Sequence, residues 1–132
     1  MKIVVMMLAA ALAAMGDASL AAAAGAPRCE AGEPAQQAQD KAIGAVAALP
    51  EVVALREALE EPLRVAFTNL AHELVAGRCG VSVPVYVDHP DRFELRATFF
   101  VDDTTGEVLD ALDPVSGDYL PLASWRASQH LD

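Results

Sequence analysis

The feature that most constrains this chain is a stretch of alternating residues that leads into a glycine turn. Every second position of residues 93–101 is apolar, and the positions between are mostly polar. This period of two predicts a β-strand with one buried face. The turn at residues 103–106 ends in Gly106, which adopts positive φ angles without a Cβ penalty. Residues 107–112 then return as the partner strand, so the sequence predicts a β-hairpin over residues 94–111.

One apolar residue, Phe100, interrupts the polar face of this hairpin. A large apolar side chain at such a position either lies beneath a second layer or stays exposed and marks a contact surface. We expect burial beneath a helix or loop, and the exposed alternative stays open.

The N-terminus has the three-part pattern of a secretory signal peptide. Lys2 provides a positive start, residues 3–15 are apolar, and small residues precede position 25. We place cleavage after Ala24, which leaves residues 25–132 as a single domain. The apolar stretch is short for a bilayer span, although a membrane anchor remains the alternative. We therefore expect a periplasmic or extracellular protein with no membrane span after cleavage.

Two cysteines, Cys29 and Cys79, remain in the expected mature chain. An even number of cysteines in an exported chain indicates a disulfide. Closing a loop of about 50 residues corresponds to an entropic stabilisation of roughly 4 kcal/mol. The alternative is a reactive thiol at Cys79, activated by the neighbouring Arg78.

The chain carries a net charge of −10. Nucleic acids and anionic membrane surfaces are bound through clustered Lys and Arg, so this composition argues against both as partners. An acidic surface suits a basic partner, or it serves solubility alone.

Helices are predicted ahead of the hairpin. Apolar residues at helical spacing indicate one helix over residues 35–49, and Pro50 is placed to begin a second. Residues 63–75 fit a helix or a strand, and periodicity does not decide between them.

Alternate valines over residues 81–87 predict a further strand. Pro84 lies within it and cannot donate to a ladder, so we expect this strand to lie at a sheet edge or to be bulged there. After a turn at residues 113–118, we expect Trp125 to pack on the sheet or under the helices.

Motifs for catalysis or metal binding are weak. His72 and His89 are separated by 17 positions and lack the spacing of a zinc site. Ser82 is followed by Pro84 where a nucleophile elbow needs glycine. We therefore predict no catalytic residues, no metal and no cofactor.

Residues 100–108, FVDDTTGEV, resemble the hairpin of PepSY-like domains. The order of helices and strands over residues 35–126 resembles small exported cystatin-like α+β proteins of bacteria. The resemblance implies an α+β fold in which N-terminal helices pack on a curved antiparallel sheet of about four strands. It favours a strand over residues 64–71. It also implies a binding module, in some cases an inhibitor of peptidases.

These observations favour an exported, non-catalytic binding module that inhibits or neutralises a basic envelope enzyme or toxin. The alternatives are an accessory domain of an envelope complex, or a small hydrolase using the two histidines. In the binding hypothesis, loop carboxylates steer a basic protein partner and an aromatic residue anchors it. The candidate carboxylates are Asp88, Asp91, Asp102 and Asp103, and the candidate anchors are Tyr86 and Phe100.

Overall fold

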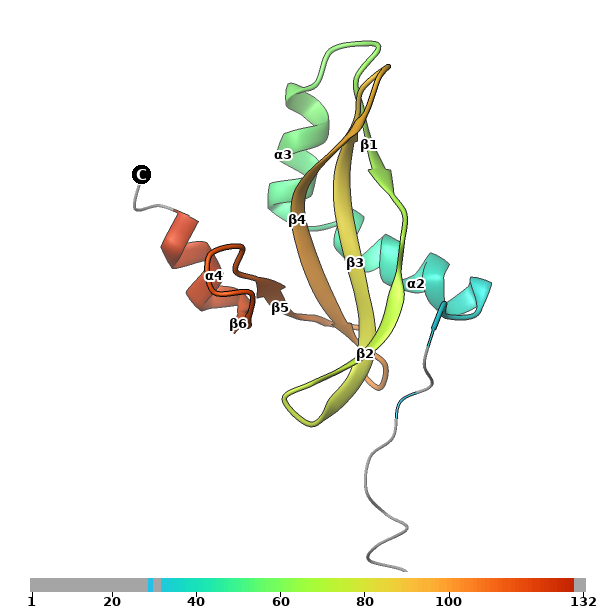
Figure 1. The fold of residues 1–132 in the computed structure, drawn as a ribbon, viewed down its shortest axis with the longest axis vertical. Helices are drawn as coiled ribbons and strands as arrows, with labels where there is room; N and C mark the ends of the chain where they lie inside the picture. The colour runs from blue at the N-terminus through green and yellow to red at the C-terminus, as the bar shows by residue number, and fades with distance from the viewer. Residues whose placement is uncertain (1–28, 30–31, 130–132) are drawn as a thin grey trace, which may run out of the picture.

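The computed structural model describes residue 29 and residues 32–129, and it has the predicted α+β class (Figure 1). The predicted signal peptide, residues 1–24, lies outside the described residues. The elements are α2 (Gln36–Ala47), α3 (Pro50–Ala58), β1 (Arg64–Phe67), β2 (Ala71–Val75), β3 (Arg78–Asp88), β4 (Phe93–Asp102), β5 (Val108–Leu112), β6 (Tyr119–Pro121) and α4 (Leu122–Gln129).

The strands form one antiparallel sheet in the order β1-β3-β4-β5-β6, with β2 also paired to β3. β1 pairs with the second half of β3 and β2 with its first half, so the two short strands share one edge. The expectation of about four strands was therefore too low. The sheet has six strands because its outer strand is broken in two and the short β6 adds another.

The helices α2, α3 and α4 pack on one face of the sheet (Figure 1). The valines of β3 point to this face, where Val83, Val85 and Val87 are almost fully buried. Trp125 of α4 packs edge-on against Phe99, with 5.3 Å between the ring centroids. This contact confirms the predicted burial of Trp125. The core also includes Ala42, Val46, Val52, Val81, Val101 and Ala111.

The central hairpin is confirmed, but its apolar face is split by a bulge. The pairing of β3 with β4 shifts between Val85 and Tyr86, so Arg96 is an extra residue in β4. An extra residue moves the preceding side chains to the other face. Phe93 and Leu95 are consequently 56% and 55% exposed. The prediction that they share the buried face of Phe99 was wrong.

Residues 64–67 and 71–75 form strands. The strand that the family resemblance favours over residues 64–71 is therefore confirmed in its first half and is interrupted at residues 68–70. Pro84 does not lie in an edge strand, because β3 is flanked on both sides. However, the pairing of β2 with β3 extends to Ser82, and the pairing of β1 with β3 begins at Val85. Val83 and Pro84 of β3 therefore face the gap between β2 and β1. This gap accommodates a residue without an N–H donor.

The predicted disulfide between Cys29 and Cys79 is formed, with Cα atoms 5.5 Å apart. Such a bond indicates an oxidising compartment. The disulfide fixes the segment before α2 against the start of β3. A second contact holds the same segment, because the His72 N–H of β2 donates to the Gly32 carbonyl. Within the described residues, no helix is long and apolar enough to cross a membrane.

Within the described residues, the sheet face opposite the helices is covered at one end only. Phe100 lies on this face and is fully buried, which confirms its predicted burial. Its ring packs over Gly80, where an added Cβ would approach the ring to 2.5 Å. The Tyr119 ring covers it from the other side at 5.9 Å. Toward the β3–β4 turn, the same face is uncovered and carries Phe93 and Leu95.

Candidate functional site: the two ends of the sheet

The predicted partner-binding residues lie at opposite ends of β4. Asp88 and Asp91 flank the turn before this strand, and Asp102 and Asp103 follow its other end. Ten strand residues extend over roughly 30 Å. The structure therefore does not bring the four carboxylates into one surface. We call the region of residues 88–96 the turn end.

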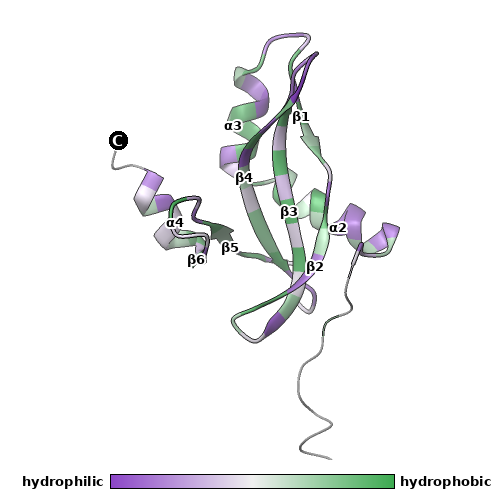
Figure 2. Cartoon of the chain, in the orientation of Figure 1, coloured by the Kyte–Doolittle hydropathy of each residue, from purple (hydrophilic) through white to green (hydrophobic). Residues whose placement is uncertain are grey.

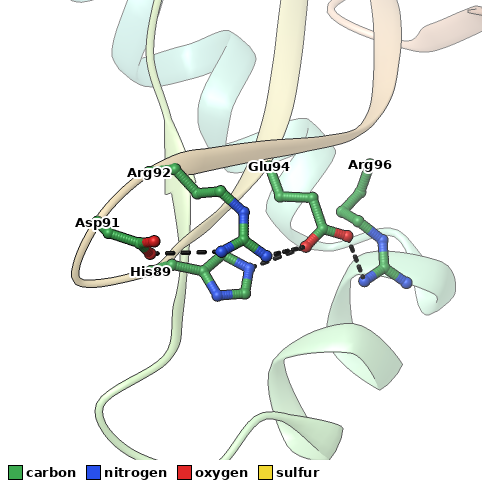
Figure 3. Close-up of polar contacts among 5 residues, drawn as sticks. All are labelled: His89, Asp91, Arg92, Glu94 and Arg96. Atoms are coloured by element: carbon green, nitrogen blue, oxygen red, sulfur yellow. Dashed lines mark hydrogen bonds and ion pairs between the residues drawn. The ribbon is translucent and has the colours of Figure 1, made fainter.

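Carboxylates at the turn end are paired with cations (Figure 3). Glu94 lies 2.8 Å from Nε2 of His89 and 3.4 Å from a guanidinium nitrogen of Arg96. The hydrogen bond from His89, aided by the charges of Arg96 and Arg92, holds the pKa of Glu94 below its ordinary value. Asp91 is 3.3 Å from Arg92.

Asp88, the last residue of β3, is also paired with a cation, because its carboxylate lies 3.8 Å from the Arg64 guanidinium of β1. Tyr86 and Phe93 make an edge-to-face contact on the uncovered face, with centroids 5.8 Å apart. The turn end is thus a mixed-charge region with an exposed apolar surface, and it projects little net charge.

The other end of the sheet has a different electrostatic character. Six carboxylates gather around the tip of β2–β3, the β4–β5 turn and the curled β5–β6 segment, and we call them the acidic end. Nearby described cations are Arg78, which acts on Asp102 and Asp110, and Lys41, which lies beside Gly106. His72 approaches Asp103 to 3.9 Å. The six are Glu73, Asp102, Asp103, Glu107, Asp110 and Asp118.

Two carboxylates at the acidic end, Glu73 and Asp102, bond to neutral groups. Tyr119 donates its hydroxyl proton to Glu73 over 2.9 Å, a bond that joins the last strand to β2 at the opposite edge. The sheet is therefore curled at this end. Burial, together with Glu73, raises the pKa of Tyr119, so the hydroxyl stays protonated and remains a donor.

Two aspartates at this end have shifted pKa values of opposite sign. Asp102 accepts hydrogen bonds from the backbone N–H and hydroxyl of Thr105, at 2.9 and 3.0 Å. The backbone bond from Thr105 is the main reason that the pKa of Asp102 is lowered. Burial raises the pKa of Asp110. Through its two bonds to Thr105, Asp102 stabilises the β4–β5 turn, in which Gly106 adopts a φ of 71°.

An open groove of about 510 Å³ lies between the tip of β2–β3 and the β5–β6 turn. Glu73 and Asp118 contribute carboxylates to its wall, and Tyr119 and Leu74 contribute apolar surface. Leu74 is 53% exposed. The groove combines negative charge with apolar contact area, which suits the long cationic side chains of Lys and Arg.

No local sequence pattern marks Glu73, Asp110, Asp118 and Tyr119 as members of one site. Their positions lie up to 46 residues apart, as in the Tyr119–Glu73 bond, and only the curl of the sheet unites them. Phe100 must be removed from the candidate anchors, because a side chain with 0% exposure offers no surface to a partner. Asp102 is 8% exposed and is engaged in its turn.

The two histidines belong to different ends. His72 is in register with Val81, whereas His89 follows Asp88 at the far end of β3. Seven residues of strand correspond to roughly 23 Å, so they share no hydrogen-bond network. In the described part of the chain, no three His, Cys, Asp or Glu side chains converge into a group that could hold a metal ion.

Comparisons with models of known protein families, with curated proteins and with solved structures find no match. What stands is a small α+β domain with helices on an antiparallel sheet. The resemblance to PepSY-like and cystatin-like domains remains a prediction.

Proposed function

We propose that this chain is an exported, non-catalytic binding domain that receives a basic protein partner at its acidic end. The observation that carries the proposal is the uneven distribution of charge. Each carboxylate of the turn end has a basic side chain within 4.0 Å. At the acidic end, Glu73 and Asp102 bond to hydroxyl and backbone groups, and Asp103 alone has a basic neighbour within 4.0 Å among the described residues, His72.

Uncompensated charge acts at long range. A field of one sign raises the local concentration of an oppositely charged partner and its association rate, and salt screens the effect. Paired charges at the turn end cancel over a short distance. The candidate set therefore shifts from the original four aspartates toward Asp103, Asp118 and Glu73.

The groove supplies short-range contacts for the same partner. A Lys or Arg side chain entering between Glu73 and Asp118 would lay its methylene groups on Leu74 and Tyr119. Inhibition or neutralisation of a basic envelope enzyme or toxin is the role that such a domain would serve. An accessory role in an envelope complex is the alternative.

The test is a capture experiment with oxidised protein, residues 25–132, and an envelope extract at low and high salt. Wild-type protein should retain one basic protein in stoichiometric amount at low salt and release it at high salt. The variant D103K/D118K should retain much less.

The matched control is D88K/D91K, which changes the net charge by the same amount at the turn end. We expect this variant to capture the basic protein nearly as well as wild type does. Equal loss with both variants, or capture that ignores salt, would contradict the assignment to the acidic end.

A further inference from the structure

β4 has a free outer edge over half its length. β5 pairs with β4 only at Phe99, Phe100 and Val101. The described residues therefore place no strand beside positions 93–98 on this side. A free edge presents unpaired N–H and C=O groups to any other strand.

Proteins protect free edges with charges and bulges, and this edge has both. Arg96 is the bulged residue, and Glu94 and Arg96 are charged. Edge protection does not explain Phe93 and Leu95, which expose more than half of their surfaces at the same place. Large exposed apolar side chains beside a free edge indicate a contact surface.

We propose that this edge pairs with the same edge of a second copy of the chain. In an antiparallel arrangement with Leu95 on the two-fold axis, Glu94 of each copy lies across from Arg96 of the other. The two positions are equally distant from Leu95 in the sequence, so one register satisfies both pairs at once. Such self-complementarity is what a two-fold interface requires.

Side chains at this edge suit the arrangement. Glu94 and Arg96 already approach each other to 3.4 Å within one chain, so their charged groups lie on the same side of the strand. Exchanging the partner within the chain for one in the other copy conserves the ion pair. The bulge at Arg96 shortens the regular ladder, so the side-chain pairs set the register.

A hollow of about 200 Å³ adjoins this edge, between β4 and α4. Leu112, Pro114 and Trp125 contribute to its lining. The proposed register places Phe93 of the other copy alongside Ala97, next to this hollow. Pairing with the other copy thereby buries more of the ring surface that the contact with Tyr86 leaves exposed.

The contact is small, and each copy carries a net charge of −10. Two acidic chains repel, so the dimer should be weak and should form at high protein concentration. A salt concentration near 0.15 M limits the repulsion to a range of about 8 Å. The acidic ends lie at the far end of β4 from the axis and remain open.

Sedimentation velocity of the oxidised protein, from micromolar to millimolar concentration, tests the proposal. Wild-type protein should shift from monomer to dimer. E94R places like charges across the axis, and R96E does the same with the opposite sign. Each variant alone should stay monomeric where wild type is dimeric.

The decisive sample is an equimolar mixture of E94R and R96E. Each position then faces an opposite charge in the other chain, although the Glu94–Arg96 pair within each chain is lost. We expect the mixture to recover the dimer. Recovery cannot arise from restored folding of either variant, and circular dichroism of each variant alone checks that folding.

A second pair of variants tests the apolar contact. L95E should abolish the dimer, whereas L74E should not, because Leu74 is similarly exposed but lies at the acidic end. A wild-type protein that stays monomeric at every concentration overturns the proposal, and so does a mixture that fails to dimerise. Neither result bears on partner capture at the acidic end, so the two proposals fail independently.

Discussion

The turn end of this sheet carries three carboxylates and the acidic end carries six, and the two ends also pair them differently. At the turn end, Glu94 is surrounded by His89, Arg92 and Arg96, and its charge is neutralised locally. At the acidic end, Glu73 and Asp102 bond to Tyr119 and Thr105, which supply no positive charge. Net charge alone therefore does not locate a binding surface, because the charged neighbours of each carboxylate determine the field that a distant molecule experiences.

Apolar packing follows the opposite trend. The acidic end buries Phe100 completely beneath Tyr119, whereas the turn end leaves Phe93 and Leu95 exposed. Figure 2 shows that this exposed apolar surface lies beside a hydrophilic β3–β4 turn. The acidic end therefore has a well-packed aromatic cluster but carboxylates with few ion pairs. The turn end has ion-paired carboxylates but exposed apolar side chains.

The largest expected effect tests this packing contrast. Phe100→Ala should lower the free energy of unfolding by about 3–5 kcal/mol, because it leaves a cavity beneath Tyr119. Phe93→Ala should lower it by less than about 1 kcal/mol, because the ring is 56% exposed. Urea denaturation of both variants measures the difference. Equal losses would mean that the two ends are packed alike.

Removal of the disulfide comes next in size. C29S/C79S should lower the free energy of unfolding by about 2–5 kcal/mol, since a closed loop of about 50 residues is released in the unfolded chain. The comparison is wild-type protein under oxidising and reducing conditions. Reduction should destabilise wild type and leave C29S/C79S unchanged, and any effect of reductant on the variant would point to another cause.

Tyr119→Phe isolates the bond between the outer strands. Losing the hydrogen bond to Glu73 should cost about 0.5–1.5 kcal/mol while keeping the ring over Phe100. Tyr86→Phe is a matched control at the turn end, where the hydroxyl accepts only a long 3.4 Å bond from the Asn69 side chain. If both substitutions cost the same, the curl of the sheet does not depend on the Tyr119 bond.

The smallest effect is a difference in pH dependence. Because the pKa of Glu94 is lowered in the folded state, ionised Glu94 stabilises the fold at pH values above 4.5, its ordinary pKa. This stabilisation is lost as the pH falls through the folded-state pKa. The raised pKa of Asp110 has the opposite sign. Its contribution is present below the ordinary value of 3.8 and is lost as the pH rises through the folded-state pKa.

Unfolding free energies of E94Q and D110N across the acidic pH range check these signs. Relative to wild type, D110N should gain stability as the pH rises, and E94Q should lose it. A common direction for both variants would contradict the assigned causes.

Local sequence patterns predicted much of the fold. Pro50 begins α3, alternating valines form β3, and Gly106 completes the hairpin turn. The bulge at Arg96 could not be predicted, because strict alternation fits a regular strand equally well and only pairing with β3 reveals the extra residue. The bulge is the reason that Phe93 and Leu95 are exposed rather than buried with Phe99.

The candidate site was harder to predict than the fold. Asp88, Asp91, Asp102 and Asp103 share turn chemistry, so the sequence grouped them by type rather than by place. The ten residues of β4 separate the two pairs, and Tyr119, which bonds to Glu73, also packs against Phe100. Long-range arrangement of this kind leaves no local pattern.

We propose that negative charge is effective at the acidic end only. The most direct measurement is an NMR titration of oxidised, isotope-labelled protein with an oligolysine peptide at low salt. Amide shifts should concentrate around Glu73, Asp103 and Asp118 and should disappear at high salt. Shifts of equal size at His89 and Glu94 would contradict the claim that the turn end is neutralised by its own cations.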